Sequence, residues 1–256
     1  MRKVRKQSDR LIKELLELRN SRKQSLDDFN FNFLLNFGDH CRLMHSNIGK
    51  DKNKEFYEVA YRQYFVFLVS SWETFFRDLF VYIYTRDIKS TEKLLEKMNI
   101  PSDYIVQNDV TLVELLSKSF NFQSIDDLES AYDSMWKENF LVSICETNLS
   151  TIGVNGKVSR DFCISSLFPD WHTVILKIFS IRHKIVHDSN YRIEPEPKFM
   201  QKAEVVFLLI PQLVTYLVAQ RYQLKHTVMS DGKVSVPYIF SIDDVLSDPA
   251  DWKVVK

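Results

Sequence analysis

Residues 54–86 read KEFYEVAYRQYFVFLVSSWETFFRDLFVYIYTR and form a long, strongly apolar segment. Its apolar residues cover most of the circumference of an ideal helix instead of a single stripe. A helix that is apolar on nearly all sides has to be covered by other elements of the fold. The segment therefore predicts one long helix at the centre of a helical bundle.

The remaining chain is predicted to be mainly helical, because apolar residues keep recurring at helical spacing. The expected helices cover residues 4–20, 25–47, 91–98, 109–118, 124–143, 169–187 and 198–225. Residues 148–157 include Gly153 and Gly156 and are expected to form a turn. The tail 233–240 alternates like a short strand or an extended arm. Only five Gly and seven Pro occur in 256 residues, and this scarcity predicts an all-α fold.

We expect a single domain over residues 1–256, because 45% hydrophobic residues can fill one large core. Its expected parts are N-terminal helices (1–50), a bundle core (51–86 and 169–225), an insertion (87–168) and a tail (226–256).

Composition favours a soluble cytoplasmic protein. Thirty-four basic residues balance 34 acidic ones, so any nucleic-acid site has to be a local patch. Cys41, Cys145 and Cys163 are widely spaced and odd in number, which is typical of reduced cytosolic thiols. The longest apolar run, Val205 to Ala219, is too short to span a bilayer. The basic start leads into an amphipathic stretch and not into an apolar signal core. We therefore expect no membrane segment.

The candidate catalytic residues lie in the segment Ile181-Arg-His-Lys-Ile-Val-His-Asp188. On an ideal helix Arg182 falls inside the apolar stripe, and His187 lies about 140° further round. An arginine can stabilise a phosphorane, and a histidine can move protons near neutral pH. Arg221 and His226 have the same spacing, but they lie on a basic, polar helix end. The apolar context therefore favours Arg182 and His187 as the site.

Structural alternatives exist for each residue of this segment. Arg182 could be a core arginine paired with Glu73 of the central helix, and a carboxylate that binds the guanidinium from behind would also hold a catalytic arginine in place. His187 could cap the helix or lie on the surface. His183 precedes His187 by one turn, which allows metal binding in principle, but no carboxylate or cysteine accompanies them. A polar helper role for His183 is the better prediction.

A second group of possible metal ligands consists of His40, Cys41 and His45. No fourth ligand follows at a sensible spacing, so this group is predicted to be an ordinary helix face. Walker, GxGxxG and GxSxG motifs do not occur in the sequence, so nucleotide-hydrolysing and esterase activities lack support. We expect no metal and no cofactor.

The segment around Arg182 and His187 resembles the HEPN superfamily. The signature of that superfamily is an Arg followed directly by a polar residue, with a His a few positions further along the chain. Ser71-Trp-Glu-Thr-Phe-Phe-Arg77 is similar to a Trp-Glu-x-Phe segment of bacterial HEPN families. The likeness covers residues 55–85 and 169–225. It implies a helical homodimer that joins both copies of the motif in one cleft and cleaves RNA without metal. It also implies a setting in toxin–antitoxin, abortive-infection or antiphage systems, with an antitoxin or sensor protein as partner.

The resemblance implies catalytic roles for Arg182 and His187, with His183 and Glu73 supporting them. Lys177, Lys184 and Arg192 border the proposed cleft and are the predicted RNA-binding residues. The expected substrate is single-stranded or loop RNA, such as a tRNA anticodon loop, because flexible strands reach the in-line geometry more easily than a stacked duplex. The alternative is a non-catalytic HEPN-like binding module.

One departure from the HEPN pattern concerns neutralisation. Some HEPN toxins carry a tyrosine two residues after the histidine, which a nucleotidyltransferase antitoxin modifies. Here that position is Ser189, and the nearest tyrosine is Tyr191. The resemblance therefore does not extend to this route of neutralisation.

Overall fold

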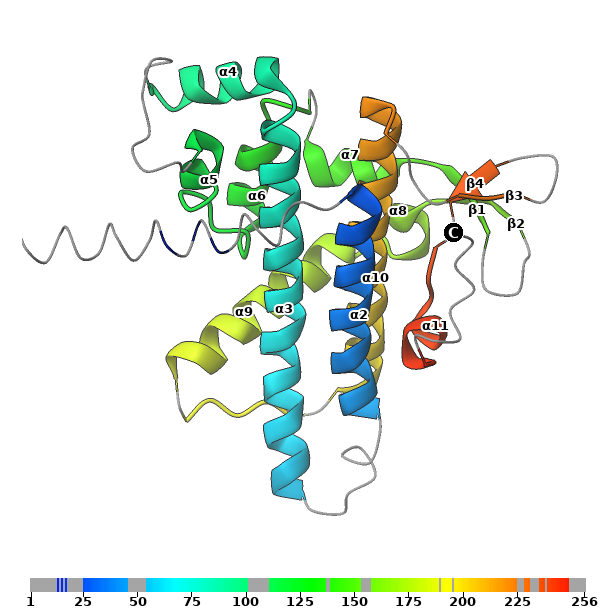
Figure 1. Ribbon diagram of the computed structural model, residues 1–256. Helices are drawn as coiled ribbons and strands as arrows, with labels where there is room; N and C mark the ends of the chain where they lie inside the picture. The colour runs from blue at the N-terminus through cyan, green and yellow to red at the C-terminus, as the bar shows by residue number, and fades with distance from the viewer. Residues whose placement is uncertain are drawn as a thin grey trace, which may run out of the picture. The chain divides into compact units, whose positions relative to one another are not determined.

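The chain folds as an all-α protein, as the sequence predicts (Figure 1). A computed structural model describes residues 25–45, 54–100, 111–136, 139–152, 158–188, 190–194, 196–224, 228–230, 235–237 and 239–248, with residues 13, 15 and 17. Its helices are α2 (Leu26–His45), α3 (Lys54–Tyr84), α4 (Ile88–Lys97), α5 (Leu112–Leu116), α6 (Ile125–Tyr132), α7 (Phe140–Glu146), α8 (Ile164–Leu167), α9 (Trp171–His187), α10 (Pro197–Tyr222) and α11 (Ile242–Leu246). The predicted helix 4–20 lies outside the described residues, except for the three isolated helical positions.

The chain forms two compact units. The first contains residues 1–25 and 76–140, and the second contains residues 26–75 and 141–256. The sequence placed the edges of an insertion at residues 87 and 168, whereas the units divide at 75/76 and 140/141. Helix α3 runs through the first of these divisions, which explains why apolar periodicity gave no signal there.

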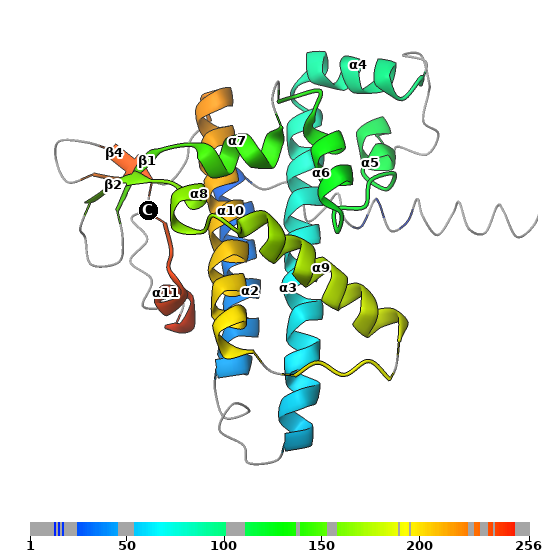
Figure 2. The same ribbon diagram turned by 180° about the vertical axis from the view of Figure 1, so that it is seen from behind.

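The second unit is built around the first two-thirds of α3. Trp72 is fully buried and contacts Phe207 of α10, with ring centroids 4.8 Å apart, and Phe179 of α9, at 6.1 Å. Phe33 of α2 packs against Phe75 at 5.3 Å. Helices α2 and α10 lie side by side, and α9 crosses α3 obliquely (Figure 2). The predicted central position of α3 within this bundle is thus confirmed.

The first unit surrounds the last turns of α3 with aromatic rings. Phe80 contacts Phe122 and Tyr132, and Tyr132 stacks on Phe140 with centroids 4.4 Å apart. The Tyr132 hydroxyl donates to the Phe76 carbonyl oxygen at 2.6 Å. The prediction of one helical piece over 124–143 is wrong, because α6 ends at Tyr132 and α7 begins at Phe140. The Phe140 N–H donates to the Glu129 carboxylate, a capping contact that local periodicity does not reveal.

Two antiparallel hairpins interrupt the helical chain. Strands β1 (Leu149–Ile152) and β2 (Val158–Phe162) pair with a register shift between Leu149 and Thr151. Strands β3 (Val228–Ser230) and β4 (Ser235–Pro237) form the other hairpin. The sequence predicted only a turn at 148–157, so β1, which lies within that range, and β2, which follows it, were missed because each has at most five residues. Within the strand or arm expected at 233–240, residues 235–237 form β4 and residues 239 and 240 are coil, and the rest of that range lies outside the described residues.

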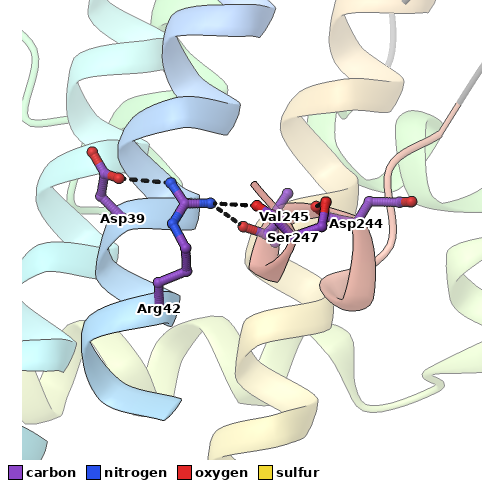
Figure 3. Close-up of polar contacts among 5 residues, drawn as sticks. All are labelled: Asp39, Arg42, Asp244, Val245 and Ser247. Carbon is purple, nitrogen blue, oxygen red and sulfur yellow. Dashed lines mark hydrogen bonds and ion pairs between the residues drawn. The ribbon is translucent and has the colours of Figure 1, made fainter. Parts of the chain in front are cut away.

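The C-terminal segment 239–248 docks on α2 and α10, and Figure 3 shows its polar contacts with Arg42 of α2. Arg42 donates to the Val245 carbonyl oxygen at 2.5 Å and to that of Ser247 at 3.1 Å. A Cβ atom at Gly38 would lie 2.8 Å from the Val245 oxygen, so this approach requires glycine. Gln212 of α10 exchanges two hydrogen bonds with the backbone of Phe240. Helix α11 was not predicted, because these contacts come from distant parts of the chain.

Helix α10 is long and apolar enough to cross a membrane by length and composition alone. In the structure, 78% of its most apolar window is buried. Val206, Leu208, Ile210 and Leu213 are fully enclosed. This burial is typical of the core helix of a soluble protein.

Candidate functional site

Helix α9 carries the Arg182–His187 segment and ends at its histidine. The N–H of Asp188 donates to the Lys184 carbonyl oxygen at 2.8 Å, and the Asp188 backbone turns to an extended conformation. The Asn190 N–H then donates to the Asp188 carboxylate at 2.9 Å. Short Asp and Asn side chains offer such local hydrogen bonds in place of the next helical turn. The predicted helix end at His187 is confirmed.

The two predicted catalytic residues lie on different faces of α9. Arg182 is half-buried and follows the stripe that packs into the core through Ile175, Ile178 and Phe179. His187 is exposed. A single α9 helix therefore presents the guanidinium on its inner side and the imidazole on its outer side, as an ideal helix predicts.

The Arg182 guanidinium contains a polar atom with no partner. Its Nε is buried and has no hydrogen-bond partner among the described residues. The expected ion pair with Glu73 is also absent from that part of the chain: Glu73 is half-buried and makes other contacts. The interpretation of Arg182 as a core arginine held by Glu73 is therefore not supported.

His183 and His187 lie next to each other on the exposed side of the last turn of α9. Their ring centroids are 4.4 Å apart and the ring planes are inclined by 47°. Within the described residues, no group of three His, Cys, Asp or Glu side chains is arranged to hold a metal ion. The pair is thus an exposed two-histidine cluster that can exchange protons with a bound ligand.

The three predicted RNA-binding cations have different surroundings. The Lys177 ammonium lies 3.3 Å from both carboxylate oxygens of Glu196 and 3.9 Å from the centroid of Phe199, so it is already engaged. The Lys184 ammonium lies 5.7 Å from the Tyr191 ring centroid. The Arg192 side chain is exposed, and its Nη1 donates to the Tyr191 carbonyl oxygen at 3.4 Å. Lys184 and Arg192 thus share Tyr191 as a neighbour, while Lys177 belongs to a separate contact.

A further arginine at this end of α9 was missed by the sequence analysis. Arg62 of α3 donates through Nη1 to the Tyr191 carbonyl oxygen at 3.2 Å, and its Nε is buried without an acceptor among the described residues. A pocket of about 300 Å³ is lined by Phe56, Glu58, Val59, Arg62 and Arg192. In the sequence, Arg62 differs from its surroundings only as a charged residue within the strongly apolar segment 54–86. No local pattern predicts that residue 62 contacts residue 191.

The residues His40, Cys41 and His45 have separate partners. The His40 ring stacks on Phe67 with centroids 4.5 Å apart, and burial lowers the pKa of His40. The Cys41 sulfur lies 3.1 Å from the Tyr64 hydroxyl, and burial is the main reason that its pKa is raised. The prediction of an ordinary helix face is consistent with these contacts. All three cysteines are free and buried.

A buried carboxylate joins two of these residues in what we call the Glu204 network (Cys41, His45, Tyr64 and Glu204). Glu204 of α10 is 1% exposed and accepts a hydrogen bond from the Tyr64 hydroxyl at 2.7 Å. His45 Nε2 lies 2.8 Å from the same oxygen. The hydrogen bond to Glu204 is the main reason that the pKa of His45 is raised. The network links α2, α3 and α10 inside the second unit.

Comparisons of the chain with protein-family models, with curated proteins and with solved structures found no match.

Proposed function

We propose that this protein is a metal-independent endoribonuclease of the HEPN type that cleaves single-stranded or loop RNA. The observation that carries the proposal is the arrangement at the end of α9. A half-buried arginine with a buried, unpartnered Nε lies five residues before an exposed histidine, which has a second imidazole beside it. A guanidinium without a carboxylate partner is suited to a phosphate, which offers acceptors of the right geometry and charge.

The reaction proposed is transesterification by the RNA itself. The 2′-oxygen attacks the adjacent phosphorus, the bond from phosphorus to the 5′-oxygen breaks, and 2′,3′-cyclic phosphate and 5′-hydroxyl ends result. One imidazole takes the proton of the 2′-hydroxyl, and another gives a proton to the leaving 5′-oxygen. Arg182 stabilises the charge on the pentacovalent phosphorus. No metal or cofactor takes part in these steps.

The divergent faces of α9 support a homodimer. Arg182 lies on the inner side and His187 on the outer side, so a second chain would supply the histidine that faces the bound phosphate. Leu176 is 47% exposed and falls on the same side of the helix as His183 and His187. This apolar side chain provides contact area for a two-fold interface along α9.

The biological setting proposed follows the HEPN resemblance. It is a cytoplasmic role in toxin–antitoxin or antiphage defence, with tRNA as one substrate and with an antitoxin or sensor protein as partner. The cytoplasmic location is supported by three free cysteines and by the burial of α10.

The decisive test is incubation of purified protein with total RNA in excess EDTA, with the product ends mapped. We expect wild type to cleave and to leave 2′,3′-cyclic phosphate ends, while Arg182→Ala and His187→Ala leave RNA intact. His172→Ala is the matched control, because His172 is an exposed histidine at the other end of α9. Arg221→Ala controls for the second Arg–His spacing.

The proposal would be overturned by intact RNA with all folded variants, or by cleavage that His187→Ala does not reduce. Normal cleavage of an RNA with a methylated 2′-oxygen at the cut site would exclude the mechanism. Intact RNA together with specific capture of RNA or a protein partner would favour the non-catalytic binding module.

A further inference from the structure

His183 and His187 lie close enough together to act as two ligands of one ion. They are separated by one turn of α9, a spacing at which the side chains of a helix are neighbours. Their ring centroids are 4.4 Å apart, and both side chains are exposed. Two imidazoles at this separation can each turn one nitrogen toward a shared ion, at the distance of about 2 Å that a transition metal requires. The geometry of the pair is therefore that of a bidentate metal ligand.

Both imidazoles are accessible to an ion from solution. Among the described residues, no hydrogen bond or ion pair joins either ring to another group, apart from the contact between the two rings. The neighbouring Lys184 has its ammonium 5.7 Å from the Tyr191 ring centroid. A metal ion would therefore displace water from the two rings and would break no hydrogen bond in this part of the protein.

The end of α9 attracts a cation, although positive side chains lie near it. His187 is in the last turn, where carbonyl groups without helical partners give the helix end a partial negative charge. The carboxylate of Asp188 follows directly, and its hydrogen-bond partner at 2.9 Å, the Asn190 N–H, is uncharged. These two features oppose the repulsion that Arg182 and Lys184 exert on a cation.

Two imidazoles also determine the class of metal. Nitrogen ligands of this kind suit Zn²⁺, Cu²⁺ and Ni²⁺, whereas Mg²⁺ and Ca²⁺ prefer oxygen. A resident structural or catalytic zinc has three or four protein ligands, and the described residues contain no such group. Two ligands, with water in the remaining positions, instead form an exchangeable site that fills when the ion is present in solution.

We propose that His183 and His187 bind one divalent transition metal ion and that this ion inhibits the protein. The inhibition rests on the proposed function, in which imidazoles take and give protons. A metal takes the lone pair of each neutral imidazole, so neither ring can then accept a proton. The binding itself does not depend on any activity. On this proposal the metal is an inhibitor and not a cofactor.

The test is a calorimetric titration of ZnCl₂ into metal-free protein, in a buffer that does not bind zinc. We expect wild type to bind one ion per chain. His183→Ala and His187→Ala should each weaken this binding at least about tenfold, because a direct ligand contributes no less than a residue that only orients one. His172→Ala and His45→Gln remove other histidines and should bind zinc like wild type. MgCl₂ should give no comparable binding.

The folded state of each variant is checked by thermal denaturation with and without ZnCl₂. Saturating zinc should raise the melting temperature of wild type, because the unfolded chain does not hold the two imidazoles side by side. The same zinc concentration should leave the melting temperature of His187→Ala unchanged. Equal zinc affinity in wild type, His183→Ala and His187→Ala would overturn the site, as would the absence of zinc binding by wild type.

Cleavage of RNA is measured in parallel, so that the two proposals can fail separately. We expect saturating zinc to slow cleavage by wild type at least about 100-fold, the contribution of acid–base catalysis, and EDTA to restore it. His172→Ala should be inhibited over the same range of zinc concentrations. Full cleavage at saturating zinc would overturn the inhibition. If cleavage is absent but zinc binding requires both histidines, the metal site stands and the nuclease proposal falls.

Discussion

Two charged side chains of the second unit, the buried Glu204 and the half-buried Arg182, have opposite surroundings. Glu204 accepts hydrogen bonds from Tyr64 and His45 within 2.8 Å. Arg182 is half-buried at the end of α9, and its buried Nε has no acceptor among the described residues. Because an unpaired buried charge costs several kcal/mol, Glu204 would destabilise the bundle without its donors. We propose that the Nε–H of Arg182 donates to a ligand. On that proposal, Glu204 holds helices together while Arg182 serves binding.

The largest expected effect concerns the exposed end of α9. We predict that His187→Ala lowers the rate of RNA cleavage by about 10³-fold, the range of a lost general acid or base. The free energy of unfolding should stay within about 0.5 kcal/mol of wild type, because the side chain is exposed. Initial rates and urea denaturation measure the two quantities. A rate within threefold of wild type would contradict the assignment.

The Glu204 network should show the opposite behaviour. Glu204→Ala is expected to destabilise the protein by about 3 kcal/mol, because it leaves the buried Tyr64 hydroxyl without its acceptor and opens a cavity. The measurement is urea denaturation followed by tryptophan fluorescence, which reports on the buried Trp72. Loss of less than about 1 kcal/mol would show that the network is not a structural support.

Gln212 is a buried polar side chain without charge, and it can be compared with Glu204 and Arg182. Gln212 is 1% exposed, and its amide exchanges hydrogen bonds with the Phe240 N–H at 2.8 Å and the Phe240 carbonyl oxygen at 3.1 Å. Gln212→Ala is expected to cost about 2 kcal/mol, since both backbone groups lose their partner. Limited proteolysis should then cut near residues 239–248 faster than in wild type. Unchanged proteolysis would contradict this docking role.

Arg182→Ala tests the comparison directly. We predict a loss of stability of at most about 1 kcal/mol, from the packing of the aliphatic stem, together with loss of cleavage. The measurement pairs urea denaturation with RNA cleavage by the same sample. A stability loss as large as that of Glu204→Ala would mean that Arg182 has a structural partner in the folded protein.

The smallest expected effect depends on pH. Hydrogen bonding to Glu204 raises the pKa of His45, so the folded state favours the protonated imidazole. The contribution is fully present below the pKa of about 6.5 of an unfolded-state histidine and is lost as pH rises through the folded-state pKa. Wild type should therefore exceed His45→Gln in unfolding free energy by about 0.5 kcal/mol more at pH 5.5 than at pH 9, a small gap because water screens the partly exposed imidazole. His172→Gln is the control, and an equal gap at both pH values would contradict the linkage.

Much of the helical framework could be predicted from the sequence. The ends of α2, α3, α9 and α10 lie within three residues of the expected ends, because capping residues and apolar periodicity are local signals. The pieces between α3 and α9 were less accurate. There the helices are short, and capping contacts such as that of Glu129 with Phe140 set their ends.

The candidate site was predictable only in part. The spacing of Arg182 and His187 placed them on different sides of α9, and the structure agrees. The presumed Arg182–Glu73 pair is absent within the described residues, and Lys177 is engaged with Glu196. Whether two side chains from different helices meet depends on the rotation of each helix about its axis, which spacing in one helix does not determine.

The sequence by itself determined that this chain is helical, that most apolar residues of α3 from Tyr61 onward are buried and that α9 ends at His187, since each follows from residues close together in the chain. Only the tertiary structure decided the partners of Glu204, the docking of residues 239–248 on Arg42 and Gln212, and the meeting of Arg62 with Arg192 at Tyr191. Most of these contacts join residues more than 25 positions apart. Arg62 and Arg192 are also far apart in the chain, and they are brought together because both donate to the Tyr191 carbonyl oxygen. Their formation depends on how the helices pack, which no local pattern records.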